Sequence, residues 1–418
     1  MTDKNPHIEV LTEKSSISDA GQIVDVLIRI TPPESDAAAT DKRPKLNFGI
    51  ALDRSGSMGG EKMRQAREAA KYCVDQLVST DTFSAVIFDD SVDVLFTNGP
   101  VRDREMLKRG LDRIEARNST ALHEGWVKAG LQVSETLEPA SINRVLLITD
   151  GQANVGETRV DRIVSQAREA AARGLTTSTI GIGSDFNEDL LMPMAEAGQG
   201  NAWHVREPLD MVRIFETEMH GLINQVGHSV TLKITPAAGF VVDDVLNDLE
   251  RDAEGRIILP NLKAGSAIEV VVRLKADTRS AGTEVELAHF EMMFIDQQTN
   301  ERNLVTALLT RRVETQSVVD AQPVEPAVVE AVALMMNARA RKEMMEHLDR
   351  GDRAGARRHL DEAIDINDIA FCFAAQSPRL RQERQELEEL KNMVANSEND
   401  VSTRKRLAYS REATRKSR

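Results

Sequence analysis

The chain has 418 residues, of which 41% are hydrophobic, and this length predicts two or three globular domains. Its formal net charge of −14 argues against nucleic-acid binding, and its apolar runs are all too short to cross a membrane. The first residues show no secretory signal pattern and only two cysteines occur, so we expect a cytoplasmic protein. Cys73 and Cys372 both fall in helical patterns, where we expect buried free thiols.

The first part of the chain, residues 1–43, has two stretches in which apolar and polar side chains alternate, at residues 8–12 and 22–30. A period of two predicts half-buried β-strands. Two strands are too few to bury a hydrophobic core by themselves. We therefore expect them to pair with strands from elsewhere in the chain.

Residues 44–226 alternate strand patterns with helical patterns. Apolar runs of strand length occur at residues 45–52, 83–88, 92–96, 144–149, 176–182 and 201–205, and helical spacing occurs at residues 60–78, 103–116, 121–137, 162–173, 188–197 and 209–224. Strands and helices that alternate in short units predict an α/β domain with a doubly wound, mostly parallel sheet.

Residues 227–313 return to a period of two, with turn residues between the strands. The strand patterns lie at residues 229–234, 256–259, 267–274, 284–294 and 304–311. Several short strands separated by turns predict an antiparallel β-sandwich. The simplest arrangement adds the two N-terminal strands to it, so that the α/β domain is inserted into a split β-sandwich.

The C-terminal part begins with residues 314–326, which contain two prolines and few large apolar residues and predict a linker. Residues 327–397 have helical spacing throughout, and we expect three helices that pack together. Residues 398–418 form a basic tail, in which residues 401–418 contain seven basic residues and a single acidic residue, Glu412. Such a segment is typical of a flexible, solvated end, and docking on an acidic partner is the second interpretation.

Oxygen-bearing side chains gather where two of the predicted strands of the α/β domain end. Asp53, Ser55 and Ser57 directly follow the first strand, and Asp150 follows strand 144–149. Thr120 precedes a predicted helix between them. Because ligands bind beyond the carboxyl ends of strands in open sheets, we expect these side chains at one edge of the sheet. Five oxygen ligands suit a hard cation, so Mg²⁺ or Mn²⁺ is favoured over Zn²⁺, and Ca²⁺ is also compatible.

Each of these residues also has an ordinary structural interpretation. Aspartate, serine and threonine are common helix caps and turn residues, and taken singly these roles would be preferred. The metal site is favoured by the combination, because three separate segments deliver oxygen ligands to one end of one sheet.

The five residues resemble the metal-ion-dependent adhesion site of the von Willebrand factor A family. The resemblance covers residues 45–225 and includes LDRSGSM at 52–58, FDD at 88–90 and TDGQ at 149–152. It implies that Ser55 and Ser57 bind the metal directly and that Asp53 binds it directly or through water. Thr120 would bind directly when a ligand is engaged, and Asp150 mainly through water.

The resemblance also implies a function in protein binding. Hydroxyl ligands donate little charge, so the cation stays attractive to a carboxylate from outside, and the expected ligand is a Glu or Asp of a partner protein. The arrangement looks like cytoplasmic bacterial proteins of the family, some of which work beside AAA+ ATPases or with protein kinases and phosphatases. We expect an adaptor rather than an enzyme, with a possible second partner on the helical region or the basic tail.

Two other functions compete with this one. Residues 55–59, SGSMG, nearly match the G-x-S-x-G motif of α/β-hydrolases, and Ser57, Asp150 and His204 occur in the order of their catalytic triad. Against a serine hydrolase, Ser55 replaces the first glycine, and His204 lies inside a strand pattern. A D-x-D phosphatase is weaker still, because Ser55 stands where the second carboxylate is needed. The other alternative is a structural scaffold with a non-essential metal site.

Overall fold

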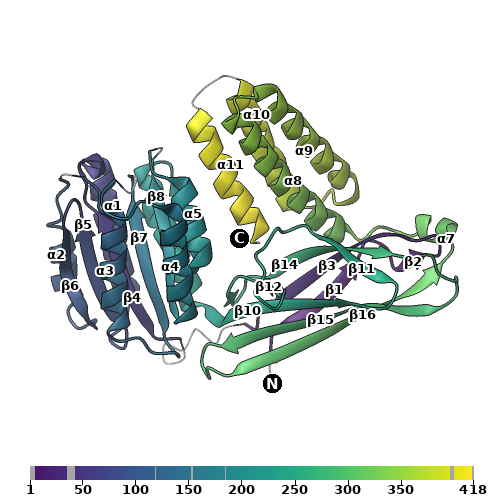
Figure 1. Cartoon of the computed structure of the whole chain (residues 1–418), viewed down its shortest axis with the longest axis horizontal. Helices are drawn as coiled ribbons and strands as arrows, with labels where there is room; N and C mark the ends of the chain where they lie inside the picture. Colours follow the sequence, from purple (N-terminus) through teal and green to yellow (C-terminus); the bar gives the residue numbers. More distant parts are fainter. Residues whose placement is uncertain are drawn as a thin grey trace. The chain divides into compact units, whose positions relative to one another are not determined.

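The computed structural model describes residues 5–34, 43–117, 119–151, 154–183, 185–395 and 400–416 (Figure 1). The chain forms two compact units. One consists of Asp36–Gln225 with Gln297–Asn300, and the other of Met1–Ser35, Val226–Asp296 and Glu301–Arg418. Within the described residues, no helix is both long enough and apolar enough to cross a membrane.

The first unit is an α/β domain built on a sheet with the strand order β6-β5-β4-β7-β8-β9. All neighbouring strands are parallel except β5 and β6, which are antiparallel. The strands are β4 (Leu46–Asp53), β5 (Thr82–Phe88), β6 (Val92–Pro100), β7 (Ile142–Thr149), β8 (Leu175–Ile182) and β9 (Gln199–Val205). Every residue of β4, β5 and β7 is buried, which explains why they read as unbroken apolar runs.

Helices cover both faces of this sheet. They are α1 (Glu61–Gln76), α2 (Arg104–Leu111), α3 (Leu122–Ser134), α4 (Val160–Ala172), α5 (Glu188–Ala197) and α6 (Met211–Ile223). Phe48 and Ile50 of β4 share one core with residues of α1, α2 and α6. The opposite face of β4 approaches α3, since a Cβ built on Gly49 would lie 2.6 Å from Val133 Cγ2. The predicted α/β domain is therefore confirmed, although helix 103–116 ends earlier, at Leu111.

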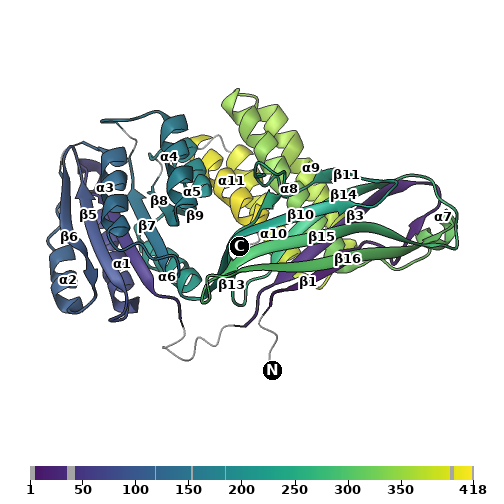
Figure 2. The ribbon, with the colours of Figure 1, turned by 60° about the horizontal axis from the view of Figure 1, so that its bottom comes forward.

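The second unit contains two β-sheets. Their strands are β1 (His7–Thr12), β2 (Ser16–Ser18), β3 (Gln22–Thr31), β10 (Gln225–Pro236), β11 (Phe240–Val245), β12 (Ile257–Ile258), β13 (Leu262–Lys263), β14 (Ile268–Ala276), β15 (Glu284–Asp296) and β16 (Arg302–Glu314). One sheet has the order β1-β3-β14-β11, and the other has the order β12-β10-β15-β16-β2, with β13 also on β10. Figure 2 shows the long strands β15 and β16 side by side.

Strands that precede the α/β unit in the sequence pair in these sheets with strands that follow it. β3 pairs antiparallel with β14, with Val26 opposite Val272, and β2 pairs parallel with β16. Apolar side chains of both sheets form one core, which includes Ile28 of β3 and Phe290 of β15. The short strands β2, β11 and β13 were not predicted from the alternation of apolar and polar residues.

The helical region follows the second sheet and is confirmed. It contains α8 (Pro326–Asp349), α9 (Arg353–Phe373) and α10 (Pro378–Ala395). Helix α8 packs on the sheet β1-β3-β14-β11, where Val328 and Leu334 share a hydrophobic cluster with Leu27 and Val271. The expected linker is only partly irregular, because it includes α7 (Gln316–Asp320).

The flexible basic tail is a wrong prediction for residues 400–415, which form α11 (Asp400–Arg415). Leu407 of α11 is fully buried in a cluster with α8, α9 and α10, and Arg404 and Arg406 form ion pairs with Asp349 and Glu389. Basic residues that suggested a solvated end thus form ion pairs that hold α11 on the other helices. The cysteine prediction is half right, since Cys73 is buried and Cys372 is exposed.

Candidate metal site

The site lies where two adjacent parallel strands end. Leu52 of β4 pairs with Ile148 of β7, so Asp53 and Asp150 emerge at the same edge of the sheet. Both aspartates are almost completely buried, with relative exposures of 0% and 1%. Two buried carboxylates side by side are unfavourable unless cations or hydrogen-bond donors compensate their charge.

A short 3₁₀ turn, η2 (Gly56–Met58), brings the two serines to these carboxylates. The backbone N–H of Ser55 donates to Asp53 Oδ1 at 2.7 Å, and the Ser55 and Ser57 hydroxyl oxygens are 3.1 Å apart. Ser57 then donates to Asp150 Oδ1 at 2.7 Å. A continuous series of polar contacts therefore joins Asp53 to Asp150, and Ser57 is its exposed member.

Thr120 reaches the same place from the loop before α3. A Cβ built on Gly151 would lie 3.3 Å from Thr120 Oγ1 and 3.7 Å from Asp53 Oδ2, so both oxygens face Gly151. The absent side chain at Gly151 keeps the space beside these oxygens open. The structure thus brings all five predicted residues together, and Thr120 is buried with them at 4% exposure.

Burial raises the pKa of Asp53 to about 6, although hydrogen bonds from Thr149 and from the Ser55 backbone oppose this effect. Thr149 Oγ1 donates to Asp53 Oδ2 at 2.5 Å. On the other carboxylate, the Lys62 ammonium of α1 forms an ion pair with Asp150 Oδ2. Sequence reasoning missed Thr149 and Lys62, although Thr149 directly precedes Asp150 and Lys62 is the second residue of a helix that begins beside the site.

A partly buried ionic network holds the loops around the site. Arg54 pairs with Asp89 at 3.1 Å and with Asp93 at 2.5 Å, and Arg117 donates to Asp89 at 2.6 Å. Burial alone would raise the pKa of Asp89, but hydrogen bonds from Ser91 and Arg117 and the charge of Arg54 hold it well below its usual range. The network connects the loops after β4 and β5 with the one that carries Thr120.

These residues fit a hard divalent cation. Hydroxyls supply three of the five oxygens and carboxylates the other two, which is a ligand set for Mg²⁺, Mn²⁺ or Ca²⁺ rather than for a soft metal. Among the residues with defined positions, no group of three or more His, Cys, Asp or Glu side chains has the arrangement of a metal site.

The arrangement does not match a catalytic triad. In a triad the histidine stands between the serine and the acid, whereas Ser57 donates directly to Asp150. His204 Nε2 instead contacts the Gly183 carbonyl oxygen at 2.8 Å, and its ring packs edge-on against Phe186. His204 has the structural position that the strand pattern predicted.

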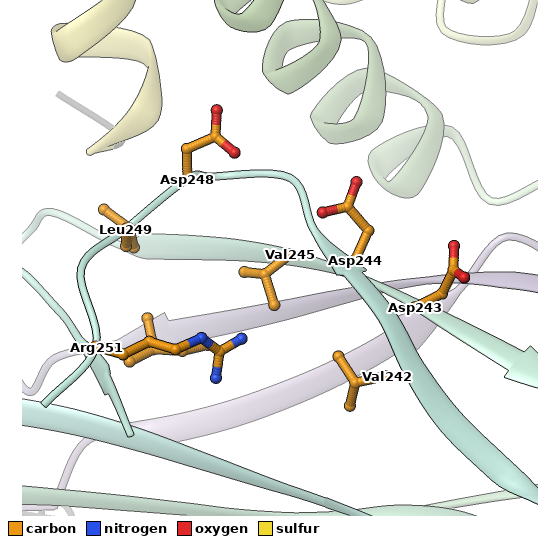
Figure 3. Close-up of a pocket in the computed structure, with 8 residues that line it drawn as sticks. Val242, Asp243, Asp244, Val245, Asp248, Leu249 and Arg251 are labelled. Atoms are coloured by element: carbon orange, nitrogen blue, oxygen red, sulfur yellow. The ribbon is translucent and has the colours of Figure 1, made fainter. Parts of the chain in front are cut away.

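A concave region of about 300 Å³ lies in the unit that contains the two β-sheets. Figure 3 shows the side chains of Asp243, Asp244 and Asp248 directed to the same side, toward the helices. Arg339 of α8 pairs with Asp244 at 2.5 Å and with Asp248 at 2.7 Å, and this guanidinium lowers the pKa of Asp244. Asp244 and Asp248 therefore join the helical region to the sheet, and we assign these two residues a structural role.

Comparison with known proteins gives a family match for the α/β unit. Residues 48–216 match the model of the von Willebrand factor type A domain. An uncharacterized protein of Synechocystis sp. is 26% identical over 77% of this chain and 79% of its own length. Mouse inter-alpha-trypsin inhibitor heavy chain H2 is 30% identical over 40% of this chain, which spans only 18% of that protein. The solved von Willebrand factor type A protein of Catenulispora acidiphila superposes with a TM-score of 0.71 at 18% identity and covers 93% of this chain and 90% of its own, which shows a common fold.

Proposed function

We propose that the chain is a metal-dependent protein-binding adaptor, because residues 48–216 match the model of the von Willebrand factor type A domain. In this proposal a divalent cation, preferentially Mg²⁺, binds an acidic side chain of a partner protein. The metal ligands are Asp53, Ser55, Ser57, Thr120 and Asp150.

The observation that carries the proposal is the convergence of two buried carboxylates and three hydroxyls at one edge of the sheet. The carboxylates balance the formal charge of a dication, while the hydroxyls add no charge. A bound cation would supply an open coordination position for an oxygen anion from outside. Since Ser57 is the exposed member of the set, we expect the partner to approach from its side.

Several of the proposed ligands are held in place by hydrogen bonds. Thr149 and the Ser55 backbone fix the two oxygens of Asp53, and Ser57 is oriented by its hydrogen bond to Asp150. The ionic network around Asp89 holds the loop that carries Thr120. Such preorganisation favours binding, because little conformational entropy is lost when the ligands engage.

We propose that the unit with the two sheets and the helical region serves as a scaffold. We interpret the two sheets as one split β-sandwich, supported by the pairing of β3 with β14 and by their common core. A second partner on the helical region is part of the proposal, supported by Ile369 and Phe373 of α9, which are 62% and 53% exposed. The free thiols support a cytoplasmic location. A link to AAA+ ATPases or to kinases and phosphatases rests on the family resemblance alone.

Metal titration tests the first part. Isothermal titration calorimetry with Mg²⁺ and Mn²⁺ should give binding to the wild-type protein and none to Asp53→Asn, which keeps the size of the side chain. Thr217→Ala, at an exposed position of α6, is the control and should bind like the wild type. Equal binding by wild type and Asp53→Asn would remove Asp53 from the site.

Partner capture tests the second part. Proteins retained by the immobilised chain in Mg²⁺ should be released by EDTA and should be missing from Thr120→Ala, while Thr217→Ala retains them. Acidic peptides taken from a captured partner should lose binding when their Glu or Asp is replaced by Gln or Asn. A set of partners that neither EDTA nor Thr120→Ala changes would contradict the proposal.

A further inference from the structure

Lys62 contributes a positive charge inside the site itself. Its ammonium forms an ion pair with Asp150 Oδ2, while Asp150 Oδ1 accepts the hydrogen bond from Ser57. The Asp150 side chain has no exposed surface, and that of Lys62 is 26% exposed. The ammonium of Lys62 therefore contacts a carboxylate that belongs to the proposed metal site, whereas part of the Lys62 side chain reaches solvent.

The other cations near the site are matched by different acids. Arg54 and Arg117 pair with Asp89 and Asp93, so their charges are balanced within the network that holds the loops. Lys62, by contrast, forms its ion pair with Asp150, which is a predicted metal ligand. It compensates one of the two buried carboxylates when no metal is bound.

Lys62 also has room to move. A Cβ built on Gly183 would lie 3.7 Å from both Cε and Nζ of Lys62, and Gly183 has a φ of +75°, a conformation that favours glycine. Gly183 thus passes close to the ammonium without a side chain of its own that would confine it. The flexible butyl chain of lysine allows the ammonium to leave Asp150 and remain at the rim of the site.

We propose that Lys62 is an internal counter-cation of the site, with opposite effects on its two ligands. In the absence of metal it occupies Asp150, so a divalent cation has to displace it and binds less tightly. Once displaced, its charge remains beside the metal and attracts the carboxylate of the partner. This inference rests on the proposed function, and it assigns to Lys62 a role in selecting anionic ligands.

The charges explain the opposite signs. Asp53 and Asp150 together balance a dication, so the ammonium of Lys62 leaves the loaded site with one formal positive charge. The interaction between two cations at short distance is repulsive, which weakens metal binding. The same excess charge is neutralised by one incoming carboxylate, which strengthens partner binding.

The test measures both ligands on the full chain. Mn²⁺ binding is followed by calorimetry, and acetate is then titrated into the Mn²⁺-loaded protein while water-proton relaxation reports the water that acetate displaces from the metal. Lys62→Met removes the charge and keeps the length, and Lys62→Arg keeps the charge. Lys71→Met is the matched control, because Lys71 lies on the same helix and pairs with Glu68 and Asp112 away from the site.

We expect Lys62→Met to bind Mn²⁺ at least about threefold more tightly than the wild type, and its Mn²⁺ form to bind acetate at least about threefold less tightly. Lys62→Arg and Lys71→Met should stay within about twofold of the wild type for both ligands. Unchanged or weaker Mn²⁺ binding by Lys62→Met, with a thermal unfolding midpoint in EDTA like that of the wild type, would overturn the inference. If Lys62→Met does not fold, Lys62→Gln replaces it with the same expectations. Failure of the wild type itself to bind Mn²⁺ would instead overturn the proposed function.

Discussion

Thr149 Oγ1 donates a 2.5 Å hydrogen bond to Asp53 Oδ2, and both residues are fully buried. Thr149 is the last residue of β7 and Asp53 is the last residue of β4, so the bond joins the ends of two adjacent strands. The bond also provides a hydrogen-bond donor to a carboxylate that is buried away from solvent. The stability of the domain and the charge of the site therefore depend on the same hydrogen bond.

Thr149→Val should separate these effects from packing, because valine has the shape of threonine without the hydroxyl. We expect the free energy of unfolding to fall by about 1–3 kcal/mol, as for other lost hydrogen bonds to a charged group. Urea denaturation in EDTA, followed by tryptophan fluorescence, measures it. Thr217→Val on the exposed side of α6 should change it by less than about 0.5 kcal/mol. Equal stabilities of the two variants would show that the bond is unimportant.

Stability in the absence of metal should depend on pH through Asp53. Its folded pKa of about 6 lies above the unfolded value near 3.9, so protonation favours the folded state. This contribution is fully present below pH of about 4 and is lost as the pH rises through about 6. In EDTA, the stability of the wild type relative to Asp53→Asn should therefore fall by about 2 kcal/mol between pH 4 and 7. A constant difference across this range would rule out Asp53 as the titrating group.

Metal should reverse this preference, because the cation binds the deprotonated carboxylate. Mn²⁺ affinity at pH 5 should be roughly tenfold weaker than at pH 7.5, since protons compete for Asp53 below its pKa. Calorimetry at the two pH values checks this result, with correction for proton release. An affinity that does not change with pH would mean that Asp53 carries no proton in the metal-free protein.

Glu218 is a second buried carboxylate of the α/β unit, and its role is structural. Its oxygens accept hydrogen bonds from Ser178 at 2.6 Å, Asn201 at 2.5 Å and Trp203 at 2.9 Å. Glu218→Ala should lower the free energy of unfolding by about 3–5 kcal/mol, because it leaves several buried donors without an acceptor.

Both tryptophans of the chain, Trp126 and Trp203, lie in the α/β unit, so their fluorescence during urea denaturation reports the unfolding of this unit. Glu216→Ala, at an exposed position two residues earlier on α6, is the control and should have little effect. If Glu218→Ala were as stable as Glu216→Ala, the three hydrogen bonds would not hold α6 on the sheet.

Helix α11 should be the part of the helical region that is most easily released. Its apolar contribution to the shared core is Leu407, and ion pairs supply much of the remaining contact. Leu407→Asp should therefore increase the rate of tryptic cleavage within residues 400–416 at least about tenfold, because it buries an unpaired charge. Tryptophan fluorescence should show an unchanged α/β unit, and cleavage as slow as in the wild type would contradict the docking of α11 through Leu407.

The sequence was most informative where burial is complete. β4, β5 and β7 are buried on both faces, so they appear as continuous apolar runs. Four of the five predicted ligands could be selected because they follow the ends of β4 and β7, and Thr120 was selected from the start of a predicted helix. Helix α11 could not be recognised as part of the fold, because Lys405 and Glu412 are buried on it, and patterns based on apolar spacing treat such residues as exposed.

The two residues of the site that were missed are hidden for different reasons. Thr149 belongs to a strand and looks like one of its β-branched residues until its partner is known. Lys62 stands in a helix that contains many charged residues, and its pairing with Asp150 depends on how α1 leaves the site. Contacts between a helix and a strand that are distant in sequence do not follow from the spacing of either element.

The pairing of β3 with β14 has a consequence for how the chain is made. Asp25 and Arg273, which form an ion pair between these strands, are 248 positions apart, and the α/β unit lies between them. At synthesis rates of about 5–20 residues per second, β3 waits roughly ten to fifty seconds for its neighbour to leave the ribosome. Residues 36–225 of the α/β unit are complete before then and can fold on their own contacts, and only residues 297–300 of the unit follow later. One edge of β3 can pair with β1 at once, whereas its other edge stays unpaired until β14 has been synthesised.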